Sequence, residues 1–396
     1  MLEILVEEKN KEEKIALVEN GNLIEYYEED KESNRKEGNI YVGTVKDIIV
    51  GMQSAFIDIG TEKNSFIHVK DILPKVDETK NEINKNVNIK ELVKPGQKIL
   101  VQIKKDSNEQ KGARVSTHIS IPSKYIVFMP NTDFVTISQK IEEKNEQDRL
   151  IKLVKENISK GNGAVIRTSA KGKEKEIIED LKRTEEKWNK IREKYEKSKN
   201  KSELIYKSES IIQKMLIDLS ENKKLEKIIT NSAKEYENLK EYLKENPEVS
   251  NIKLELSQDN IFEKYDLVKQ IEKLEKRKIW LKCGGFITID KTEALTAIDV
   301  NTGKYTGSKN LDDTIYNVNK EATIEIAKQL RLRDIGGIII IDYIDMTNKN
   351  NKSKIEELLK EELKKDRSKT QVEGFTKLDL LEMTRKHICS HKDSWK

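Results

Sequence analysis

Apolar and polar residues alternate along the first 35 positions of the chain. The stretches "LEILVEE" and "KIALVENGNLIEYYEE" show the period of two that is typical of half-buried strands. Asn20-Gly21 interrupts the second stretch, and this dipeptide favours the two-residue turn of a β-hairpin. The pattern therefore predicts a strand on each side of this turn.

The alternation continues in shorter runs between residues 38 and 119. "GNIYVGTVKDIIVGMQSAFIDIGTEKNSFIHVKDI" is divided by Gly43, Gly51 and Gly60, and "PGQKILVQIKKD" and "KGARVSTHIS" follow it. Short alternating strands with glycines at the corners predict a small closed barrel.

After "MPNTDF" the pattern changes to helix, strand, helix. "EQDRLIKLVKENISKG" has a helical period, "GAVIRTSA" is a strand pattern, and an amphipathic stretch runs from Lys173 to about Lys199. Residues 200–276 mix short helices and strands. The charged "LVKQIEKLEKRK" is predicted to be a solvated helix.

The last portion of the chain predicts two strands joined by a helix. "IWLKCGGFITIDKTEALTAIDVNTG" precedes a helix from Asp312 to Arg333, which Gly336-Gly337 end, and "IIIIDYIDM" is the following strand. The apolar positions of the helix recur every three or four residues: Ile315, Val318, Ala322, Ile326 and Leu330. Such a helix can pack on the sheet and return the chain, so that the two strand ends lie side by side.

Polar side chains follow the apolar residues at both strand ends. Asp299 and Asn301 are two positions apart and face the same side of a strand. Asp342 is the first polar residue after four isoleucines. Two carboxylates and an amide oxygen suit Mg²⁺, which would neutralise a phosphodiester and activate a water.

A purely structural role for the two aspartates explains the spacing equally well. Asp299 and Asp342 would then cap the strand ends or pair with Arg331 and Arg333, because Asp and Asn are common where strands end. Spacing alone does not choose between these interpretations.

Composition narrows the class of protein. At roughly 100 to 200 residues per domain, a chain of 396 residues has room for two to four domains. The 75 Lys and Arg against 71 Asp and Glu give a net charge of +4, too small to indicate a polyanionic partner. The N-terminus "MLEILVEEKNKEEK" has no apolar signal region, no membrane segment is found, and only Cys283 and Cys389 are present. We expect a cytoplasmic protein without disulfides.

Several motifs together resemble the ribonuclease E/G family, closest to its ribonuclease G branch. They are "GMQSAFIDIGTEKNSFIHVKDI", "EALTAIDVNTGKYTG", "NKEATIEIAKQLRLRDIGGIIIIDYIDM" and "LLEMTRK". The similarity covers nearly the entire chain in the expected order. It implies an α+β multidomain fold with an RNase H-like subdomain, an inserted S1-type OB-fold barrel, a 5′-sensor subdomain and a DNase I-like catalytic α/β subdomain. The expected bounds are 1–35 and 213–276 for the RNase H-like part, 36–119 for the barrel, 120–212 for the sensor and 277–396 for the catalytic part.

The resemblance also implies an activity, a cofactor and their residues. A bacterial enzyme of this family cleaves single-stranded A/U-rich RNA endonucleolytically, leaving a 5′-phosphate and a 3′-hydroxyl, in rRNA maturation and mRNA turnover. Asp299 and Asp342 would hold one Mg²⁺ per active site, and Asn301 would position the scissile phosphate or the attacking water. Asp345, on another face of the strand, would have a supporting role.

Two further sites follow from the resemblance. Arg167 and Thr168 match a pocket that senses a 5′-monophosphate, with Val127 lining it. The pocket departs from the family at Ser123, where members have glycine, and at Gln139, where they have arginine. The RNA-binding residues expected on the barrel are Phe56, Phe66 and Lys111.

The end of the sequence differs most from the family. Members usually carry a "CPxCxG" zinc motif after "EMTRK", followed by a small oligomerisation domain, and neither is present. His387, Cys389 and His391 alternate but are weak evidence for a metal, so zinc is not expected. We expect a homodimer whose partners are single-stranded RNAs, namely rRNA precursors and mRNA. An RNA-binding protein with an S1-type domain and little or no catalysis, and a nuclease acting on DNA, are the alternatives.

Overall fold

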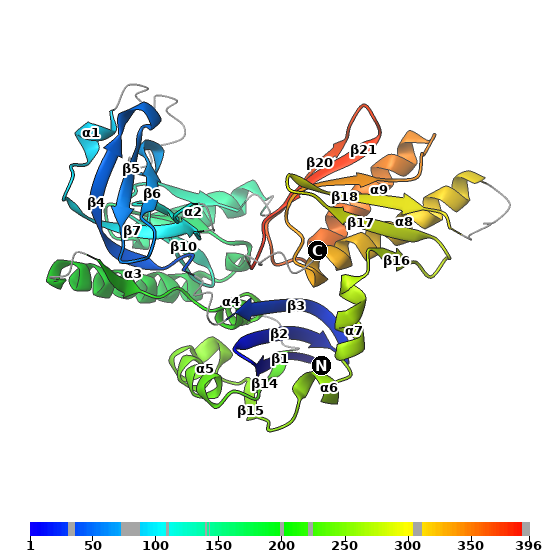
Figure 1. Cartoon of the computed structure of the whole chain (residues 1–396), viewed down its shortest axis with the longest axis horizontal. Helices are drawn as coiled ribbons and strands as arrows, with labels where there is room; N and C mark the ends of the chain where they lie inside the picture. Colours follow the sequence, from blue (N-terminus) through cyan, green and yellow to red (C-terminus); the bar gives the residue numbers. More distant parts are fainter. Residues whose placement is uncertain are drawn as a thin grey trace. The chain divides into compact units, whose positions relative to one another are not determined.

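The protein divides into two compact units, which are described separately. The computed structural model describes residues 1–30, 36–72, 88–107, 111–138, 141, 143–198, 202–220, 225–303 and 311–389. One unit comprises Met1–Ser33 and Ile211–Lys396, and the other comprises Asn34–Ser210 (Figure 1). Within the described residues, no helix is both long enough and apolar enough to cross a membrane.

The first unit contains a five-stranded sheet whose strands come from two separate parts of the chain. Its strands are β1 (Leu2–Lys9), β2 (Glu12–Glu19), β3 (Asn22–Asp30), β14 (Leu225–Thr230) and β15 (Lys253–Leu256), in the order β15-β14-β1-β2-β3. The β2–β3 turn has positive φ at Asn20 (50°) and Gly21 (80°), which confirms the predicted hairpin. The helices of this layer are α4 (Ile211–Leu219), α5 (Ala233–Glu245), α6 (Ile261–Lys264) and α7 (Val268–Glu272). Apolar side chains of α4 and α5 pack on one face, and those of α6 pack on the other.

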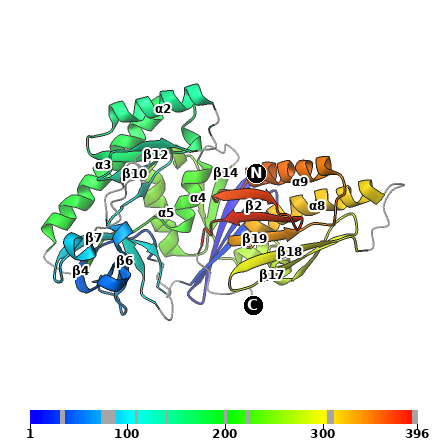
Figure 2. The same cartoon turned by 90° about the horizontal axis from the view of Figure 1, so that it is seen from above.

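The second sheet of this unit has six strands and a helical layer on one face. Its order is β16-β17-β18-β19-β21-β20. The strands are β16 (Lys278–Trp280), β17 (Phe286–Lys291), β18 (Leu295–Asn301), β19 (Gly337–Asp342), β20 (Thr370–Phe375) and β21 (Leu380–Arg385). The helices α8 (Leu311–Leu332) and α9 (Lys349–Leu363) lie on the same face (Figure 2). The predicted helix at 312–333 is therefore confirmed to within one residue.

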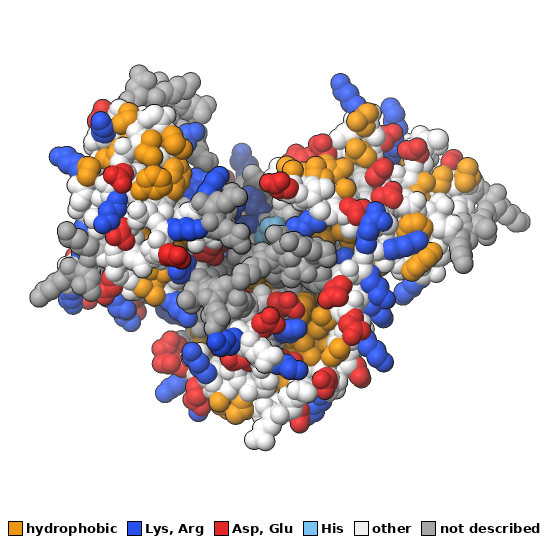
Figure 3. Space-filling view, in the orientation of Figure 1, with side chains coloured by type: hydrophobic (Ala, Val, Ile, Leu, Met, Phe, Trp, Pro, Cys, Tyr) orange, Lys and Arg blue, Asp and Glu red, His pale blue; other side chains and the backbone are white. Residues whose placement is uncertain are grey.

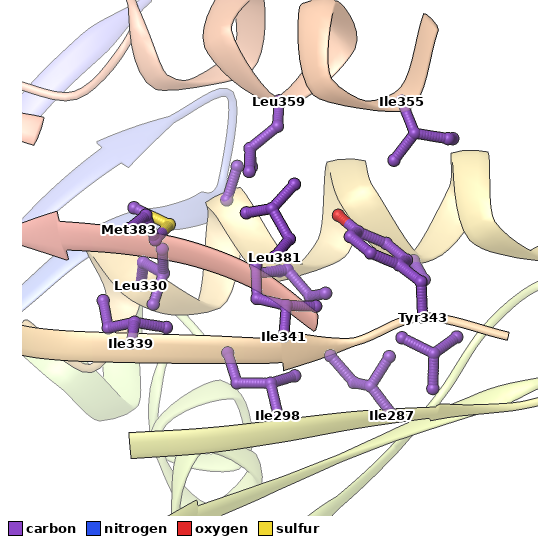
Figure 4. Close-up of a cluster of buried hydrophobic side chains, with 14 of the residues drawn as sticks. Ile287, Ile298, Leu330, Ile339, Ile341, Tyr343, Ile355, Leu359, Leu381 and Met383 are labelled. Carbon is purple, nitrogen blue, oxygen red and sulfur yellow. The ribbon is translucent and has the colours of Figure 1, made fainter. Parts of the chain in front are cut away.

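A single apolar cluster fills the space between this sheet and its two helices. Ile298, Ile339 and Ile341 point from the strands toward Leu330 of α8 and Leu359 of α9 (Figure 4). All five side chains are nearly inaccessible to solvent. Burying a side chain of this size contributes about 1.5–3 kcal/mol to the stability of the fold. The cluster therefore holds α8 and α9 against this face of the sheet.

The second unit contains a closed barrel, as the sequence predicts. Strands β4 (Ile40–Ile49), β5 (Ser54–Asp58), β6 (Ser65–His68), β7 (Lys98–Lys105) and β8 (Arg114–Ser116) form it, and β4 pairs with β7 to close it. Strand β13 (Glu203–Tyr206) adds to β4, and the short α1 (Ile89–Leu92) packs into the barrel core. Because β4 and β7 pair with each other, the barrel has no open edge at these two strands.

A small sheet covered by two helices completes the second unit. Its strands are β9 (Ile121–Pro122), β10 (Ile126–Pro130), β11 (Val135–Ile137) and β12 (Asn162–Ile166), in the order β11-β12-β10-β9. Helices α2 (Lys144–Asn157) and α3 (Glu174–Lys197) pack against it. The predicted order of helix, strand and helix is thus confirmed.

The charged stretch "LVKQIEKLEKRK" is only partly helical. Helix α7 and a 3₁₀ turn at Lys273–Glu275 end before Lys278 begins β16. The helix prediction was wrong for the end of this stretch because Ile279 packs against the apolar cluster of the second sheet, which requires a strand there.

Buried ion pairs stabilise the first unit. Arg385 on β21 is fully buried and donates to Asp334 at 2.7 Å and to Asp366 at 2.8 Å. The Asp334 carboxylate also accepts from the backbone N–H of Cys389 at 2.7 Å. His387 and Cys389 are therefore involved in structural contacts, with His387 Nδ1 at 2.8 Å from the carbonyl of Asp334, and His391 lies outside the described residues.

Glu25 and Arg367 form a second buried pair. Three hydrogen bonds join the guanidinium of Arg367 to the carboxylate of Glu25, and a fourth joins it to Asp218 at 3.1 Å. Burial alone would raise the pKa of Glu25, but the charge and hydrogen bonds of Arg367 outweigh it and hold the pKa below its usual value. Because the folded-state pKa is lowered, the pair stabilises the fold above the unfolded-state pKa of about 4.3.

We therefore predict that Glu25→Gln lowers the free energy of unfolding by about 3 kcal/mol at neutral pH, since it leaves Arg367 without its main counter-ion. The difference from wild type should narrow as the pH falls below about 4.3, because Glu25 of the unfolded wild type then binds a proton that folding must release, until the folded protein is protonated at its own lower pKa. Urea denaturation followed by circular dichroism at several pH values would measure it. Glu361→Gln, which removes an exposed partner of Lys364 on α9, should stay close to wild type throughout. A difference that does not depend on pH would contradict the prediction.

Candidate active site

The two aspartates singled out in the sequence lie opposite each other on neighbouring strands. β18 and β19 are parallel, and their register pairs Asp299 with Asp342. Ile298 and Ile341 are buried against the helices, whereas both aspartates are exposed on the opposite face. Neighbouring strands are separated by about 4.8 Å, so the two carboxylates can reach a common ligand.

Asn301 belongs to the same cluster. It is two residues after Asp299 on β18, is half-buried, and its amide nitrogen donates a hydrogen bond to the Asp299 carboxylate. With the nitrogen engaged in this way, the amide oxygen is the atom available for a metal or a phosphate-bound water. The structure therefore brings Asp299, Asn301 and Asp342 together on one open sheet face.

The electrostatics of the cluster favour a cation. Partial burial raises the pKa of Asp342, and the negative charges of Asp299 and Asp345 raise it further. Within the described part of the chain, neither Asp299 nor Asp342 forms an ion pair with Lys or Arg. A divalent cation between the two carboxylates would relieve this repulsion.

The predicted alternative in which these aspartates pair with Arg331 and Arg333, at the C-terminal end of α8, is wrong. Arg331 donates to the carbonyl oxygen of Glu362. Arg333 donates to the side chain of Gln329 at 2.7 Å and to the carbonyl of Lys276 at 2.9 Å. Both guanidinium groups therefore bind groups near the C-terminal end of α8 and neither binds Asp299 or Asp342.

The donor set fits Mg²⁺ in kind, although it is small. Among the described residues, no group of three or more His, Cys, Asp and Glu side chains is arranged to hold a metal ion. Two carboxylates and an amide are nevertheless sufficient for Mg²⁺, which keeps several water ligands and commonly binds through one or two carboxylates plus substrate phosphate. Soft ligands that would favour zinc are absent from this cluster of three residues.

A buried asparagine holds the chain directly after Asp342, and the sequence analysis did not identify it. Asn319 of α8 is fully buried; its amide donates to the Ile344 carbonyl at 2.8 Å and accepts from the Ile344 N–H at 3.1 Å. Thr323, one turn further along α8, is hydrogen-bonded to the Tyr343 hydroxyl at 2.9 Å. A polar residue next to Val318 on the apolar face of the predicted helix was the only available signal. These contacts position the end of β19.

The end of β18 is held by a tight turn. Gly303 has a positive φ of 58°, and a Cβ there would lie 2.5 Å from the carbonyl oxygen of Gly284. Gly284 belongs to the turn before β17. In that turn, the backbone N–H groups of Lys282 and Cys283 donate hydrogen bonds to Glu321 of α8. The turn before β17 therefore packs closely against the residues that follow Asn301, and only glycine fits at position 303.

In the second unit, the two predicted aromatic residues of the barrel lie together. Phe56 on β5 is paired in register with Phe66 on β6, and their ring centroids are 6.4 Å apart. Both rings are partly exposed, and hydrophobic side chains gather over β5 and β6 in Figure 3. Lys111 is exposed next to Gly112, whose close approach to Asn64 sets it near the start of β6.

The residues expected to sense a phosphate lie at one end of the small sheet. The guanidinium of Arg167 donates to the carbonyl of Ser123 at 2.8 Å, and Thr168 donates to the Ser138 hydroxyl at 3.2 Å. Val127 is paired with Val165, which is two residues before Arg167, so Val127 and Arg167 share a face. Gln139 lies outside the described residues.

Comparisons with known proteins agree with the family suggested by the motifs. The sequence model of the ribonuclease E/G family matches residues 120–388. Ribonuclease G of Escherichia coli is 41% identical over 391 residues, which cover 97% of this chain and 79% of that protein. Ribonuclease G of Haemophilus influenzae is 42% identical over 392 residues, with the same coverage of 97% and 79%. Ribonuclease E of Escherichia coli is 33% identical over 394 residues, 98% of this chain and 37% of that protein.

We predict that Asn319→Leu weakens divalent-metal binding at the aspartate pair about 10-fold, as loss of a supporting hydrogen bond commonly does. The substitution keeps the branched shape of the side chain, at a larger volume, but removes both hydrogen bonds to Ile344. Mn²⁺ binding measured by electron paramagnetic resonance would test it. Leu239→Ala on α5, which creates a cavity in the other sheet's core, should reduce stability without changing metal affinity. Equal metal affinities of Asn319→Leu and wild type would contradict the prediction.

Proposed function

The chain belongs to the ribonuclease E/G family and is an endoribonuclease, and we propose that it hydrolyses single-stranded A/U-rich RNA with one Mg²⁺ ion held by Asp299 and Asp342. The observation that supports this proposal most directly is the register of β18 and β19, which sets the two carboxylates opposite each other. The family membership rests on 41% identity over 97% of the chain.

Each residue of the cluster has a distinct task in this proposal. The carboxylates of Asp299 and Asp342 would hold the cation, which when bound would supply positive charge near the scissile phosphate and make a water more acidic. Asn301, fixed by its hydrogen bond to Asp299, orients the phosphate or the attacking water. Water adds to phosphorus and the bond to the 3′-oxygen breaks, so the products carry a 5′-phosphate and a 3′-hydroxyl.

The subdomain assignments are part of the proposal. The strand order β15-β14-β1-β2-β3, with two parallel and two antiparallel pairings, supports an RNase H-like subdomain split between 1–35 and 213–276. The six-stranded sheet with α8 and α9 on one face supports a DNase I-like catalytic subdomain from residue 277 onward. The five-stranded barrel is consistent with an S1-type OB-fold between residues 36 and 119.

We assign single-stranded RNA binding to the barrel. Phe56 and Phe66 present two partly exposed rings side by side, and Lys111 supplies a positive charge on the same domain. Stacking of a base on such a ring is worth about 1–3 kcal/mol and tolerates different sequences. These residues would therefore bind RNA without selecting one sequence.

We assign recognition of a 5′-monophosphate to Arg167, Thr168 and Val127 in the sensor part, residues 120–212. A guanidinium fork and a hydroxyl are suited to a terminal phosphate. Because Arg167 also donates to the carbonyl of Ser123, that backbone contact can hold the guanidinium in position. The biological substrates proposed are rRNA precursors and mRNA, and the proposed assembly is a homodimer.

Asp299→Asn and Asp342→Asn are each expected to abolish Mg²⁺-dependent cleavage of a labelled A/U-rich RNA, because each removes a carboxylate ligand while keeping the side-chain shape. RNA affinity in EDTA should remain within about twofold of wild type, since the stacking residues lie on other elements. Asp259→Asn, which removes an exposed carboxylate paired with Lys264 beyond β15, is the matched control and should retain cleavage. Near-normal turnover by either variant would refute the metal-site assignment. Wild-type protein that binds RNA but yields no product would indicate an RNA-binding role.

RNA carrying a 5′-monophosphate should be cleaved about 10-fold faster than the same RNA with a 5′-hydroxyl, as expected from hydrogen bonds to a charged group. Arg167→Gln should remove this difference by slowing cleavage of the monophosphorylated RNA alone. Arg149→Gln, which removes an exposed arginine from α2, should preserve it. Equal rates for the two RNAs with wild-type protein would argue against the sensor.

A further inference from the structure

An aromatic and basic cluster lies on the same open sheet face as the aspartates. Trp280 and Lys278 project from the edge strand β16, and Phe286 projects from β17 beside Trp280. The Trp280 and Phe286 rings are 5.3 Å apart between centroids and are inclined by 62°. The ammonium of Lys278 lies 4.3 Å from the Trp280 centroid and 3.5 Å from the Phe286 centroid. No step of the catalytic proposal uses these three residues.

Trp280 is unusually exposed for its size. Its relative exposure is 56%, whereas Trp188 in the second unit is 6% exposed. Phe286 packs edge-on against it, which restricts the indole orientation while more than half of the Trp280 surface stays exposed. Over β16 in Figure 3, a hydrophobic surface is bordered by Lys and Arg side chains. A large exposed aromatic ring surrounded by positive charge is complementary to a nucleotide, which offers a π-face and a phosphate.

The strand register relates this cluster directly to the proposed catalytic residues. Phe286 is paired with Asn301, and Thr288 beside it is paired with Asp299. Trp280 is paired with Phe286, so Trp280 and Asn301 stand in one row across three strands. At about 4.8 Å between neighbouring strands, Trp280 lies about 10 Å from Asn301, within reach of a nucleotide next to the scissile phosphate.

We propose that Trp280 stacks on the base of a nucleotide that flanks the scissile phosphate, with Phe286 supporting the indole and Lys278 attracting the adjoining phosphate. This inference rests on the proposed endoribonuclease activity and adds a binding subsite to it. The subsite is separate from Phe56 and Phe66, which belong to the other compact unit. Its effect is to hold the RNA backbone against Asp299 and Asp342 through the neighbouring base, regardless of which base it is.

The test removes the base and the ring separately and together. A short A/U-rich RNA with one cleavage site is prepared with a single abasic nucleotide at each position near the cleaved bond in turn. For wild-type protein, one flanking abasic position should lower kcat/KM about 10-fold, as loss of a base–aromatic stack would. Trp280→Ala should lower kcat/KM equally on unmodified RNA, and the same abasic position should then cause no further loss. If the two losses multiply at every position, the proposal is wrong.

Conservative and control variants separate stacking from general damage. Trp280→Phe should recover most of the activity, because a phenyl ring also stacks. Leu256→Ala, which removes a side chain with 49% exposure from β15, should leave all rates unchanged. Unfolding midpoints of all three variants should be near wild type, since none of the side chains is buried. A Trp280→Phe variant as impaired as Trp280→Ala would count against stacking.

A second measurement does not depend on cleavage. In the Asp342→Asn background, titration with the unmodified RNA should quench tryptophan fluorescence, and Trp280→Phe should remove most of the quenching. If wild-type protein fails to cut RNA in Mg²⁺, the proposed function fails, while this titration still tests the stack. If Trp280→Ala instead changes the sedimentation coefficient and shows no coupling to any base, Trp280 contacts a second copy of the chain and the proposal is overturned.

Discussion

The parallel register between β18 and β19 is the constraint on which the candidate active site depends. Side chains on a strand alternate between faces, and a slip of one residue would exchange every buried and exposed position. Ile339 and Ile341 must face α8 and α9 to be buried, so Asp342 must face the other way. The same reasoning applied to Ile298 determines the direction of Asp299. The apolar core thus orients two carboxylates that contribute nothing to it.

Polar contacts complete what the apolar core leaves unspecified. The apolar core determines on which face of the sheet Asp342 lies, but not at which residue β19 ends. The two hydrogen bonds between Asn319 and Ile344 fix the chain just beyond that end. Arg385 performs a similar task at the end of β21 by joining Asp334 and Asp366. A buried polar group without its partner costs about 1–3 kcal/mol, so these contacts specify one arrangement strongly. The open face can then carry the exposed Trp280 and two carboxylates that form no ion pair with a described Lys or Arg, because stability is supplied from the other side of the sheet.

Much of the fold could be predicted because its patterns are local. The Asn20-Gly21 hairpin, the barrel strands, the helix–strand–helix order and the helix at 312–333 all follow from periodicity and turn residues, which act over a few positions. Local pattern failed within "LVKQIEKLEKRK", where charge alone suggested a helix. Lys278, the last residue of this stretch, begins β16 because β17 offers hydrogen bonds and the following Ile279 packs on an apolar surface, and both partners come from later in the chain.

The sequence by itself determined which residue types are available for chemistry. They are two aspartates and an asparagine at strand ends, an Arg-Thr pair, and two phenylalanines in predicted barrel strands. The tertiary structure decided which of them meet. Asp299 and Asp342 are paired only because α8 brings the chain back so that β19 starts at the right position beside β18. The spacing of the two residues in the sequence does not specify that position. The row of Trp280, Phe286 and Asn301 had no sequence signal at all, because register across three strands is set by the packing of the whole sheet.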